Sequence, residues 1–364
     1  MTSLLKPNPD ALRTGGYSVP PAALRDPATA IRLDANENPI PPSDKALAAA
    51  VQALNGAIRY PDPLSTALRR AIAEAEGLPV GQIVCGHGSE ELIFMLARTW
   101  LQRGDEMVLP ATTFSIFRIA GLLAGAEIVS APENRLRLDV DALLACVTDR
   151  TRVVAVANPN NPTGALAPFD EIVRLHRALP RHVLLILDAA YAEYVTDAGY
   201  RDGHELVTPD GNVLVLRSFS KAHGLAGLRV GWCHAPTEVC ALLNRVKPVF
   251  NVAAPNAAAA AASIFERERL ARVRDASQAA SAEYEALWRD LGLFAIQGAA
   301  NFTYVETPAP DGGRPGLYEH LAAANIKVMM LGGYGLERSL RITFGTPEEN
   351  AQVIAAAREW ARLG

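Results

Sequence analysis

The sequence predicts an α/β protein with a large domain built on an open, mostly parallel central sheet, followed by a smaller α+β domain. Short apolar runs alternate with helical stretches between residues 82 and 233, as in parallel sheets covered by helices. Four of these runs end in polar or glycine-rich clusters, where open α/β sheets bind ligands. After residue 249 a long helical region precedes short strands, which indicates the second domain.

Composition narrows the possible function classes. The chain has 364 residues, of which 49% are hydrophobic and 20% charged, so it can bury a sizeable core. A net charge of -4 gives no electrostatic reason to expect nucleic acid or an anionic membrane as a partner. The four cysteines lack metal-ligand spacing, so no metal site is predicted. Since neither a signal peptide nor a membrane-spanning run is apparent, we expect a cytoplasmic protein.

Three regions are expected along the chain. Residues 1–35 are rich in proline and glycine, and we expect an arm that packs with the small domain. Residues 36–249 form the predicted large domain, with a helix at 44–54 and a turn at 59–63 that leads into a second helix. The apolar runs expected as its strands are 82–85, 106–110, 127–130, 153–157, 183–187, 213–217 and 228–233. The helical stretches expected between them are 86–101, 138–147 and 169–179.

The small domain is predicted over residues 250–364. It starts with a long helical region at 255–291 and ends with a helix at 348–363. Its expected strands are 301–306, 326–331 and 340–345.

Lys221 follows the buried run at 213–217 in the stretch RSFSKAHGLAGLRVGW. Desolvation at a buried strand end disfavours the charged lysine, and a free amine can form a Schiff base. The hydroxyls of Ser218 and Ser220 and the guanidinium of Arg229 suit a phosphate. Aldehyde chemistry beside a phosphate predicts pyridoxal phosphate (PLP). The alternative for this stretch alone is a solvated lysine after a strand.

Three further clusters follow strand ends. Residues 86–90 bend from a strand into a helix whose first N–H groups can bind an anion; the alternative is an ordinary turn. NPNNPTG at 158–164 has two X-Pro pairs that fix the backbone and can orient the amide of Asn161 toward a ligand. The alternative is a rigid turn with a structural role only. Asp188, at a buried strand end, needs a cation such as a pyridinium, with Tyr191 close by; the alternative is a helix N-cap.

Two candidates lie outside these clusters. Phe114 offers a ring to stack on a cofactor, although a phenylalanine by itself is more often part of the core. Arg341 lies within an expected strand of the small domain, where it needs an anionic partner, and bidentate binding of a substrate carboxylate is the functional interpretation.

The motifs NPNNPTG, DAAY, SFSKAHGLAGLRVG and LRITFGTPEEN, in this order and spacing, resemble those of fold-type I PLP-dependent aminotransferases. The closest resemblance is to the histidinol-phosphate aminotransferase family, and it runs from LDANENP through RYPDP and GHGSEE to the C-terminus. The resemblance implies a fold-type I PLP transferase, with the central sheet in the large domain.

The resemblance also implies roles for individual residues. Lys221 holds the cofactor through a Schiff base and moves the substrate proton, while Asp188 pairs with the pyridine nitrogen. Asn161 and Tyr191 bond the cofactor's 3′ oxygen, and Phe114 takes the stacking position. The residues that match positions around the cofactor phosphate are Ser89, Glu90, Ser218, Ser220 and Arg229.

Further matches concern the substrate and a second subunit. Tyr60 matches a tyrosine that reaches the phosphate of the neighbouring subunit's cofactor, which implies a homodimer with shared active sites. Tyr17 and Asn38 match substrate-side positions, and Arg341 matches the carboxylate-binding arginine.

Met329 departs from the family pattern, because it stands where an arginine thought to read the substrate phosphate is expected. Methionine cannot pair with a dianion. Lys327, two residues away on the same strand face, is a possible substitute. His87 stands where the family often has asparagine.

The sequence therefore predicts a dimeric PLP aminotransferase that acts on an amino donor and a 2-oxo acid acceptor. The default pair is L-histidinol phosphate and 2-oxoglutarate. Transamination of an aromatic or other apolar amino acid is the second hypothesis, favoured by Met329 and Met330. A PLP decarboxylase on the same scaffold is the third, and a PLP binder without turnover is the least favoured.

Overall fold

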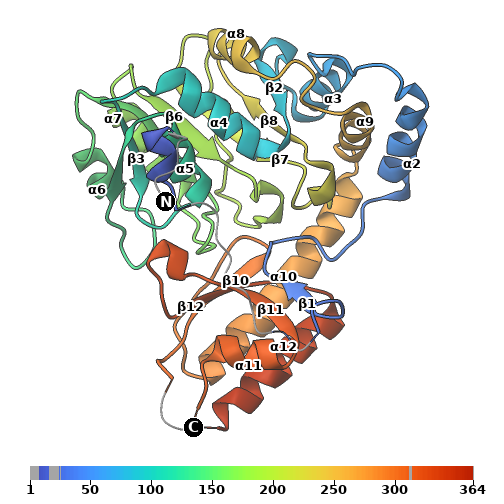
Figure 1. Cartoon of the computed structure of the whole chain (residues 1–364), viewed down its shortest axis with the longest axis vertical. Coiled ribbons are helices and arrows are strands. Elements are labelled where there is room, and N and C mark those ends of the chain that lie inside the picture. The colour runs from blue at the N-terminus through green and yellow to red at the C-terminus, as the bar shows by residue number, and fades with distance from the viewer. Residues whose placement is uncertain (1–7, 16–23, 25, 311–313, 364) are drawn as a thin grey trace, which may run out of the picture.

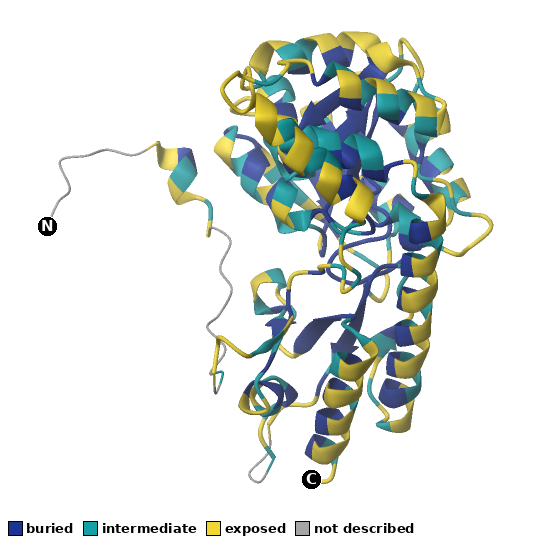
Figure 2. Ribbon diagram, turned by 90° about the vertical axis from the view of Figure 1, so that its right-hand side faces the viewer, coloured by how far each residue is buried: buried dark blue, intermediate teal, exposed yellow. Residues whose placement is uncertain are grey.

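The computed structural model describes residues 8–15, 24, 26–310 and 314–363. Two domains lie one above the other, and the long helix α10 (Arg267–Asp290) runs from the upper, large domain into the lower, small one (Figure 1). Buried residues concentrate in the sheets and on the helix faces turned toward them (Figure 2).

The large sheet confirms the predicted α/β architecture. Its strands are β2 (Ile83–Gly86), β3 (Glu106–Pro110), β4 (Glu127–Ala131), β5 (Thr151–Ala157), β6 (Leu184–Asp188), β7 (Val213–Ser218) and β8 (Gly231–His234). They are ordered β2-β8-β7-β6-β5-β3-β4. Only β8 runs antiparallel to its neighbours among the described strands of this sheet. The carboxyl ends of β2, β3, β5, β6 and β7 therefore lie at one edge.

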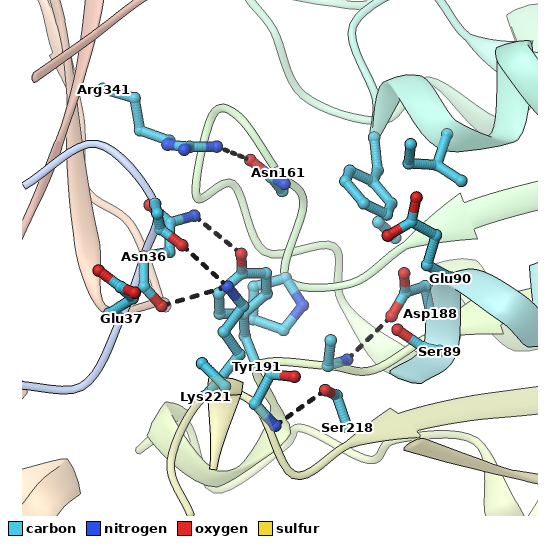
Figure 3. A pocket seen from close by; sticks show the side chains of 18 of the residues that line it. Asn36, Glu37, Ser89, Glu90, Asn161, Asp188, Tyr191, Ser218, Lys221 and Arg341 are labelled. Atoms are coloured by element: carbon cyan, nitrogen blue, oxygen red, sulfur yellow. Dashed lines mark hydrogen bonds between the residues drawn. The ribbon is translucent and has the colours of Figure 1, made fainter. Parts of the chain in front are cut away.

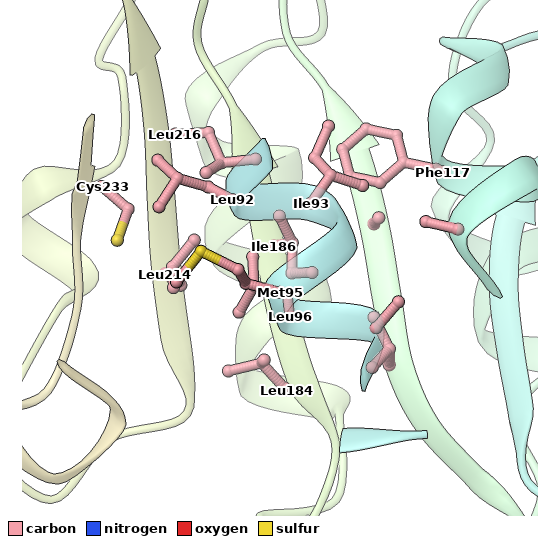
Figure 4. Packing of buried hydrophobic residues seen from close by; sticks show 14 of the residues in the cluster. Leu92, Ile93, Met95, Leu96, Phe117, Leu184, Ile186, Leu214, Leu216 and Cys233 are labelled. Carbon is pink, nitrogen blue, oxygen red and sulfur yellow. The ribbon is translucent and has the colours of Figure 1, made fainter. Parts of the chain in front are cut away.

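Helices cover both faces of this sheet. One face carries α4 (Gly88–Trp100), α5 (Ser115–Leu123) and α8 (Thr237–Val246), and the other carries α6 (Val140–Ala145) and α7 (Phe169–Ala178). The apolar side chains of α4 recur on one side of the helix, so Leu92 and Leu96 pack against Ile186 and Leu214 of the central strands (Figure 4). Helices α2 (Asp44–Ala53), α3 (Thr66–Glu76) and α9 (Ala254–Ser263) pack together beyond β8.

The small domain is a five-stranded sheet, ordered β1-β11-β12-β10-β9, with helices on it. The strands are β1 (Ile31–Leu33), β9 (Ala295–Ile296), β10 (Phe302–Glu306), β11 (Ile326–Met330) and β12 (Ser339–Thr343). Its helices are the lower part of α10, α11 (Leu317–Ala323) and α12 (Pro347–Ala361), the last of which begins with a Thr346–Glu349 capping box. The short 3₁₀ helices of the chain are η1 (Leu54–Gly56), η2 (Val80–Gln82), η3 (Ala192–Tyr194), η4 (His204–Leu206), η5 (Ala226–Leu228) and η6 (Gly332–Tyr334).

The structure differs from the expected arrangement in two places. The described part of the predicted arm packs with both domains rather than with the small one alone. Strand β1 pairs with β11 of the small domain, whereas α1 (Pro9–Leu12) lies on α5 of the large domain. Asp10 of α1 also pairs with Arg103, in the loop after α4, at 2.6 Å. The expected helical region at 255–291 is two helices, and no glycine or proline marks the break at 264–266. Since α9 packs on α2 and α3, it lies beside the large domain, and the boundary at 249 stays a prediction.

None of the helices in the described part of the chain combines the length and the apolarity that crossing a bilayer requires.

Candidate active site

A cavity of about 390 Å³ lies at the carboxyl edge of the large sheet, closed on its other side by the small domain and by residues 35–37 (Figure 3). Most of the predicted site residues line it, although they come from segments far apart in the sequence. They are Ser89, Glu90, Phe114, Asn161, Asp188, Tyr191, Ser218, Ser220, Lys221, Arg229 and Arg341. The strand order explains most of this meeting, because most segments of the large domain follow strands whose carboxyl ends reach the same edge. Arg341 reaches the cavity from within β12 of the small domain.

Lys221 projects from the turn after β7 toward residues 35–36. Its Nζ donates to the carbonyl oxygens of Ala35 at 3.1 Å and Asn36 at 3.2 Å. Burial lowers the pKa of Lys221 to about 7; the positive charge of Arg341 adds to this, and the carboxylate of Glu37 opposes it. A large fraction of the amine is therefore free at neutral pH and can act as a nucleophile or base.

Asp188 ends β6 and is buried at the cavity wall. Its Oδ1 accepts from the backbone N–H of Ala190 at 3.0 Å. Burial raises the pKa of Asp188 to about 6, although the Ala190 N–H and the charge of Lys221 act in the opposite direction. No lysine, arginine or histidine of the described chain forms an ion pair with this carboxylate. The site therefore offers a buried carboxylate to a cation that the protein does not supply.

Two polar pairs form the side of the cavity toward the small domain. The hydroxyl of Tyr191 accepts from Nδ2 of Asn36 at 2.8 Å, and burial raises the pKa of Tyr191 to about 12, so this hydroxyl stays protonated. Arg341, on β12, donates through Nη1 to Oδ1 of Asn161 at 2.5 Å and through Nη2 to the carbonyl of Asp34 at 2.6 Å. Both partners of Arg341 are neutral, so the guanidinium keeps its charge available for an anion.

The opposite end of the cavity is built for an anion. Nη1 of Arg229 donates to Oγ of Ser220 at 3.1 Å, and the N–H of Ser220 donates to Oγ of Ser218 at 3.0 Å. The N-terminus of α4, with Ser89, opens onto the same space. Gly88 has a φ of 78°, and a Cβ there would come within 2.5 Å of Nη2 of Arg229, so a glycine is required for this close approach.

These groups fit PLP. Arg229, the serine hydroxyls and the α4 N-terminus suit its phosphate, and the uncompensated carboxylate of Asp188 suits its pyridine nitrogen. The amine of Lys221 lies on the same cavity as both and suits its aldehyde. Phe114 adds an apolar ring to the wall.

Of the remaining predicted site residues, Tyr17 lies outside the described residues. Three others are described and do not line the cavity. Asn38 donates to the carbonyl of Ala222 at 2.9 Å and accepts from the N–H of Ile40, so it fixes a loop rather than facing a substrate. Tyr60 is 80% exposed and stacks on Phe250 with ring centroids 4.4 Å apart.

Met329 is the third of these residues, and it is not among the described residues that line the cavity. It is buried in an apolar cluster with Ala165, Tyr304 and Leu331, while Met330 packs on the core of the small domain. Lys327 does not turn to the cavity either, because its Nζ pairs with Asp34 at 2.8 Å.

Sequence reasoning missed three polar residues of the wall, namely Asn36, Glu37 and Tyr334. Asn36 and Glu37 line the cavity, whereas Asn38, the predicted member of the same tripeptide, does not. In the structure Asn36 has a φ of 54°, a left-handed conformation that asparagine tolerates better than most residues. Tyr334, on η6, also lines the cavity, and its hydroxyl lies 3.5 Å from Oγ of Ser115 across the opening.

Comparisons with known proteins agree with this geometry. A histidinol-phosphate aminotransferase of Rhodopseudomonas palustris (strain TIE-1) is 40% identical over 97% of this chain and 98% of its own length. One from Rhodospirillum centenum (strain ATCC 51521 / SW) is 41% identical over 98% of each. The crystal structure of histidinol-phosphate aminotransferase from Sinorhizobium meliloti, in complex with pyridoxal-5'-phosphate, superimposes with a TM-score of 0.90 at 27% identity, covering 99% of both chains.

A Thermus thermophilus aspartate aminotransferase shares the fold, with a TM-score of 0.84 at 20% identity over 99% of this chain and 100% of its own. The model of the family described as aminotransferase class I and II matches residues 28–357. The chain therefore belongs to the aminotransferase class I and II family and is a PLP-dependent aminotransferase.

Proposed function

We propose that the protein transfers the amino group of L-histidinol phosphate to 2-oxoglutarate, giving imidazole acetol phosphate and glutamate. The observation that carries the reaction class is one cavity in which the amine of Lys221, the carboxylate of Asp188 and the guanidinium of Arg341 meet. The substrate pair follows the relatives of about 40% identity, each of them a histidinol-phosphate aminotransferase.

The residues of the cavity divide the work. Bound PLP supplies an aldehyde for covalent linkage and an electron-withdrawing ring that stabilises negative charge at the substrate carbon. Asp188 keeps the pyridine nitrogen protonated, since an ionised carboxylate favours its charged partner. Nζ of Lys221 takes and returns the proton of the substrate carbon as a base whose pKa is matched to neutral pH. Asn161 and Tyr191 hold the cofactor's 3′ oxygen.

Arg341 serves both half-reactions. Among the described residues that line the cavity, the cations are Lys221, Arg229 and Arg341. The first two are assigned to the cofactor, which leaves Arg341 for substrate. In histidinol phosphate a phosphorylated hydroxymethyl group takes the place of the carboxylate of an amino acid. Arg341 therefore meets the phosphate of the donor and the carboxylate of the acceptor in turn.

A second candidate function, transamination of an aromatic or other apolar amino acid, is favoured by Met329. This residue lies directly opposite Arg341 in the pairing of β11 with β12. A methionine there adds no second cation for a dianionic phosphate, whereas a single arginine suffices for a carboxylate.

A half-reaction assay tests both functions. Purified holoenzyme is mixed with single donors, and conversion of the cofactor to pyridoxamine phosphate is followed by absorbance. Fast conversion with histidinol phosphate supports the first function, and fast conversion with phenylalanine alone supports the second. Release of carbon dioxide from an amino acid marks a decarboxylase, and no reaction with any donor marks a binder; either would contradict both.

The proposal includes a homodimer with shared active sites. Tyr60 is exposed and stacks on Phe250, which is exposed as well. Exposed aromatic rings that pack on each other support a surface that a partner covers. A mixture of Tyr60→Phe and inactive Lys221→Ala variants should regain activity above that of Tyr60→Phe alone, because one site of the heterodimer has both native residues. A monomer by light scattering would contradict the dimer.

A further inference from the structure

Glu193 is a largely buried carboxylate, with its side chain 11% exposed, that the proposed reaction does not use. It lies in η3, two residues after Tyr191 and five after Asp188. Its Oε1 accepts from Nη2 of Arg217 at 2.6 Å, and Nε2 of His223 lies 3.7 Å from the same oxygen. Arg217 precedes Lys221 by four residues and His223 follows it by two, so one carboxylate contacts both sides of the lysine turn.

Each partner of Glu193 is itself fixed. Nη1 of Arg217 donates to Asp202 at 2.5 Å, and its guanidinium lies over the Trp232 ring, 5.7 Å from the centroid. Nδ1 of His223 lies 3.1 Å from Oγ of Ser263 on α9. Glu193 therefore joins the segment after β6 to the segment around Lys221. Its partners Arg217 and His223 in turn join that segment to β8 and α9.

Glu193 is held ionised. Burial by itself would raise the pKa of Glu193, but the charge of Arg217 and the contact with His223 lower it to about 2. Loss of one partner from a buried ion pair leaves an uncompensated charge, so the contact resists separation.

We propose that Glu193 is a positioning residue for Lys221: through Arg217 and His223 it holds the turn of residues 217–223 at a fixed distance from the segment that carries Asp188 and Tyr191. The inference rests on the proposed role of Lys221. A turn held in this way keeps Nζ of Lys221 away from water, within reach of the carbonyls of residues 35–36.

Loosening the turn has a measurable consequence for the lysine amine. The charged groups that act on Lys221 are Arg341, Glu37, Arg229 and Asp188, but burial is the largest influence. If Glu193 is lost and the turn opens toward solvent, the burial penalty on the charged amine falls and the pKa of Lys221 rises.

The test measures that pKa in the protein without cofactor, so it does not depend on turnover. Apoprotein is treated with acetic anhydride across a pH series, and acetylation of the Lys221 peptide is quantified by mass spectrometry. Wild type should show a midpoint near 7. Glu193→Gln should raise the midpoint by about one pH unit, and Glu193→Asp, which keeps the charge with a shorter reach, by less.

Glu106→Gln is the matched control. Glu106 is also a largely buried carboxylate, paired with Arg150 at the start of β3. Its described side-chain partners are Thr148, Arg150 and Thr151, which lie outside residues 217–223. Both Gln variants should lower the melting temperature, but only Glu193→Gln should move the Lys221 midpoint.

An unchanged midpoint in Glu193→Gln, or an equal shift in Glu106→Gln, would overturn the proposal. If Glu193→Gln does not fold, Glu193→Asp decides by the same criterion. Reduction of the holoenzyme with borohydride tests the role of Lys221 separately. PLP found on another lysine would contradict the proposed function. The acetylation result would still decide whether Glu193 affects the pKa of Lys221.

Discussion

Each of the two sides of the cavity presents a basic side chain, and the two side chains differ in whether they keep their positive charge at neutral pH. On the large-domain side, burial and the nearby charge of Arg341 lower the pKa of Lys221 to about 7. On the small-domain side, Arg341 is only 3% exposed, yet a guanidinium remains protonated in proteins. The same kind of environment therefore favours the neutral, reactive amine of Lys221 but leaves the guanidinium of Arg341 charged and able to bind an anion.

The partners of the two side chains extend this comparison. Lys221 and Arg341 both donate to neutral oxygens, and neither forms an ion pair with a described carboxylate. For the lysine, the absence of a counter-ion helps the amine to lose its proton. For the arginine, it leaves the charge for a substrate anion. Exchanging or altering these side chains tests the comparison.

The largest effect is expected from Lys221→Arg, which keeps the positive charge and removes the titratable amine. Because proton transfer by a positioned base contributes roughly 10²- to 10⁴-fold, and covalent linkage to the cofactor is lost as well, kcat should fall by at least about 10⁴-fold. Steady-state assays and borohydride labelling measure this. Activity within tenfold of wild type would show that the charge, rather than the free amine, is what matters at this position.

Asp188→Ala is expected to have the second largest effect. Removing one partner of a buried ion pair costs roughly 3–5 kcal/mol, so the Kd for pyridoxamine phosphate should rise by more than about a hundredfold. Pyridoxamine phosphate has no aldehyde, and its binding, measured by calorimetry, therefore leaves the Schiff base chemistry of Lys221 out.

The pH dependence of the same binding gives a second check on Asp188. The pKa of Asp188 in the free protein is raised to about 6, so the carboxylate is protonated below this pH and must ionise to pair with the ring. Binding should weaken as the pH falls from 7 to 5, and Asp188→Asn should lose this component. Equal affinity and an equal pH profile in wild type and variant would restore the interpretation of Asp188 as a helix cap.

The comparison also shows how far the sequence reaches. The large-domain side was predictable, because Asp188, Asn161 and Lys221 each follow an apolar run, and parallel strands bring their carboxyl ends together. The role of Arg341 as an anion-binding residue was predictable, because a charged side chain within an expected strand needs a partner of opposite charge. These arguments depend only on local pattern and sheet geometry.

What the sequence did not predict depends on contacts between distant segments. Asn36 is a site residue because its side chain reaches Tyr191, 155 residues away. Asn38 is also an asparagine, but it differs from Asn36 in backbone conformation, burial and the direction of its side chain, and composition does not encode these differences. For the same reason the sequence predicted the strand β11, but it did not predict the apolar cluster in which Met329 is buried.

Arg341→Lys tests the small-domain side and is expected to have an intermediate effect. A lysine keeps the charge but loses the planar fork that contacts Asn161 and Asp34 together. One charge-assisted hydrogen bond to substrate is worth about 1.5–3 kcal/mol, so kcat/KM should fall roughly ten- to a hundredfold for donor and acceptor alike. A loss confined to one of the two substrates would contradict the shared use of Arg341 in both half-reactions.

The smallest effect, and the one that separates the two proposed functions, is expected from Met329→Arg. Directly paired residues on neighbouring strands have Cβ atoms about 4.5–5.5 Å apart, so an arginine here lies beside Arg341 and adds a second cation. A phosphate dianion gains more from it than a carboxylate does. The ratio of kcat/KM for histidinol phosphate to that for phenylalanine should rise about tenfold, while stability falls because the apolar cluster receives a charge.

Met330→Arg is the matched control, since it places the same charge one residue along, on the opposite face, against the small-domain core. If both variants change the ratio equally, or if wild type already prefers histidinol phosphate more than a hundredfold and Met329→Arg leaves that preference unchanged, the phosphate is bound without help from this strand and Arg341 alone is sufficient.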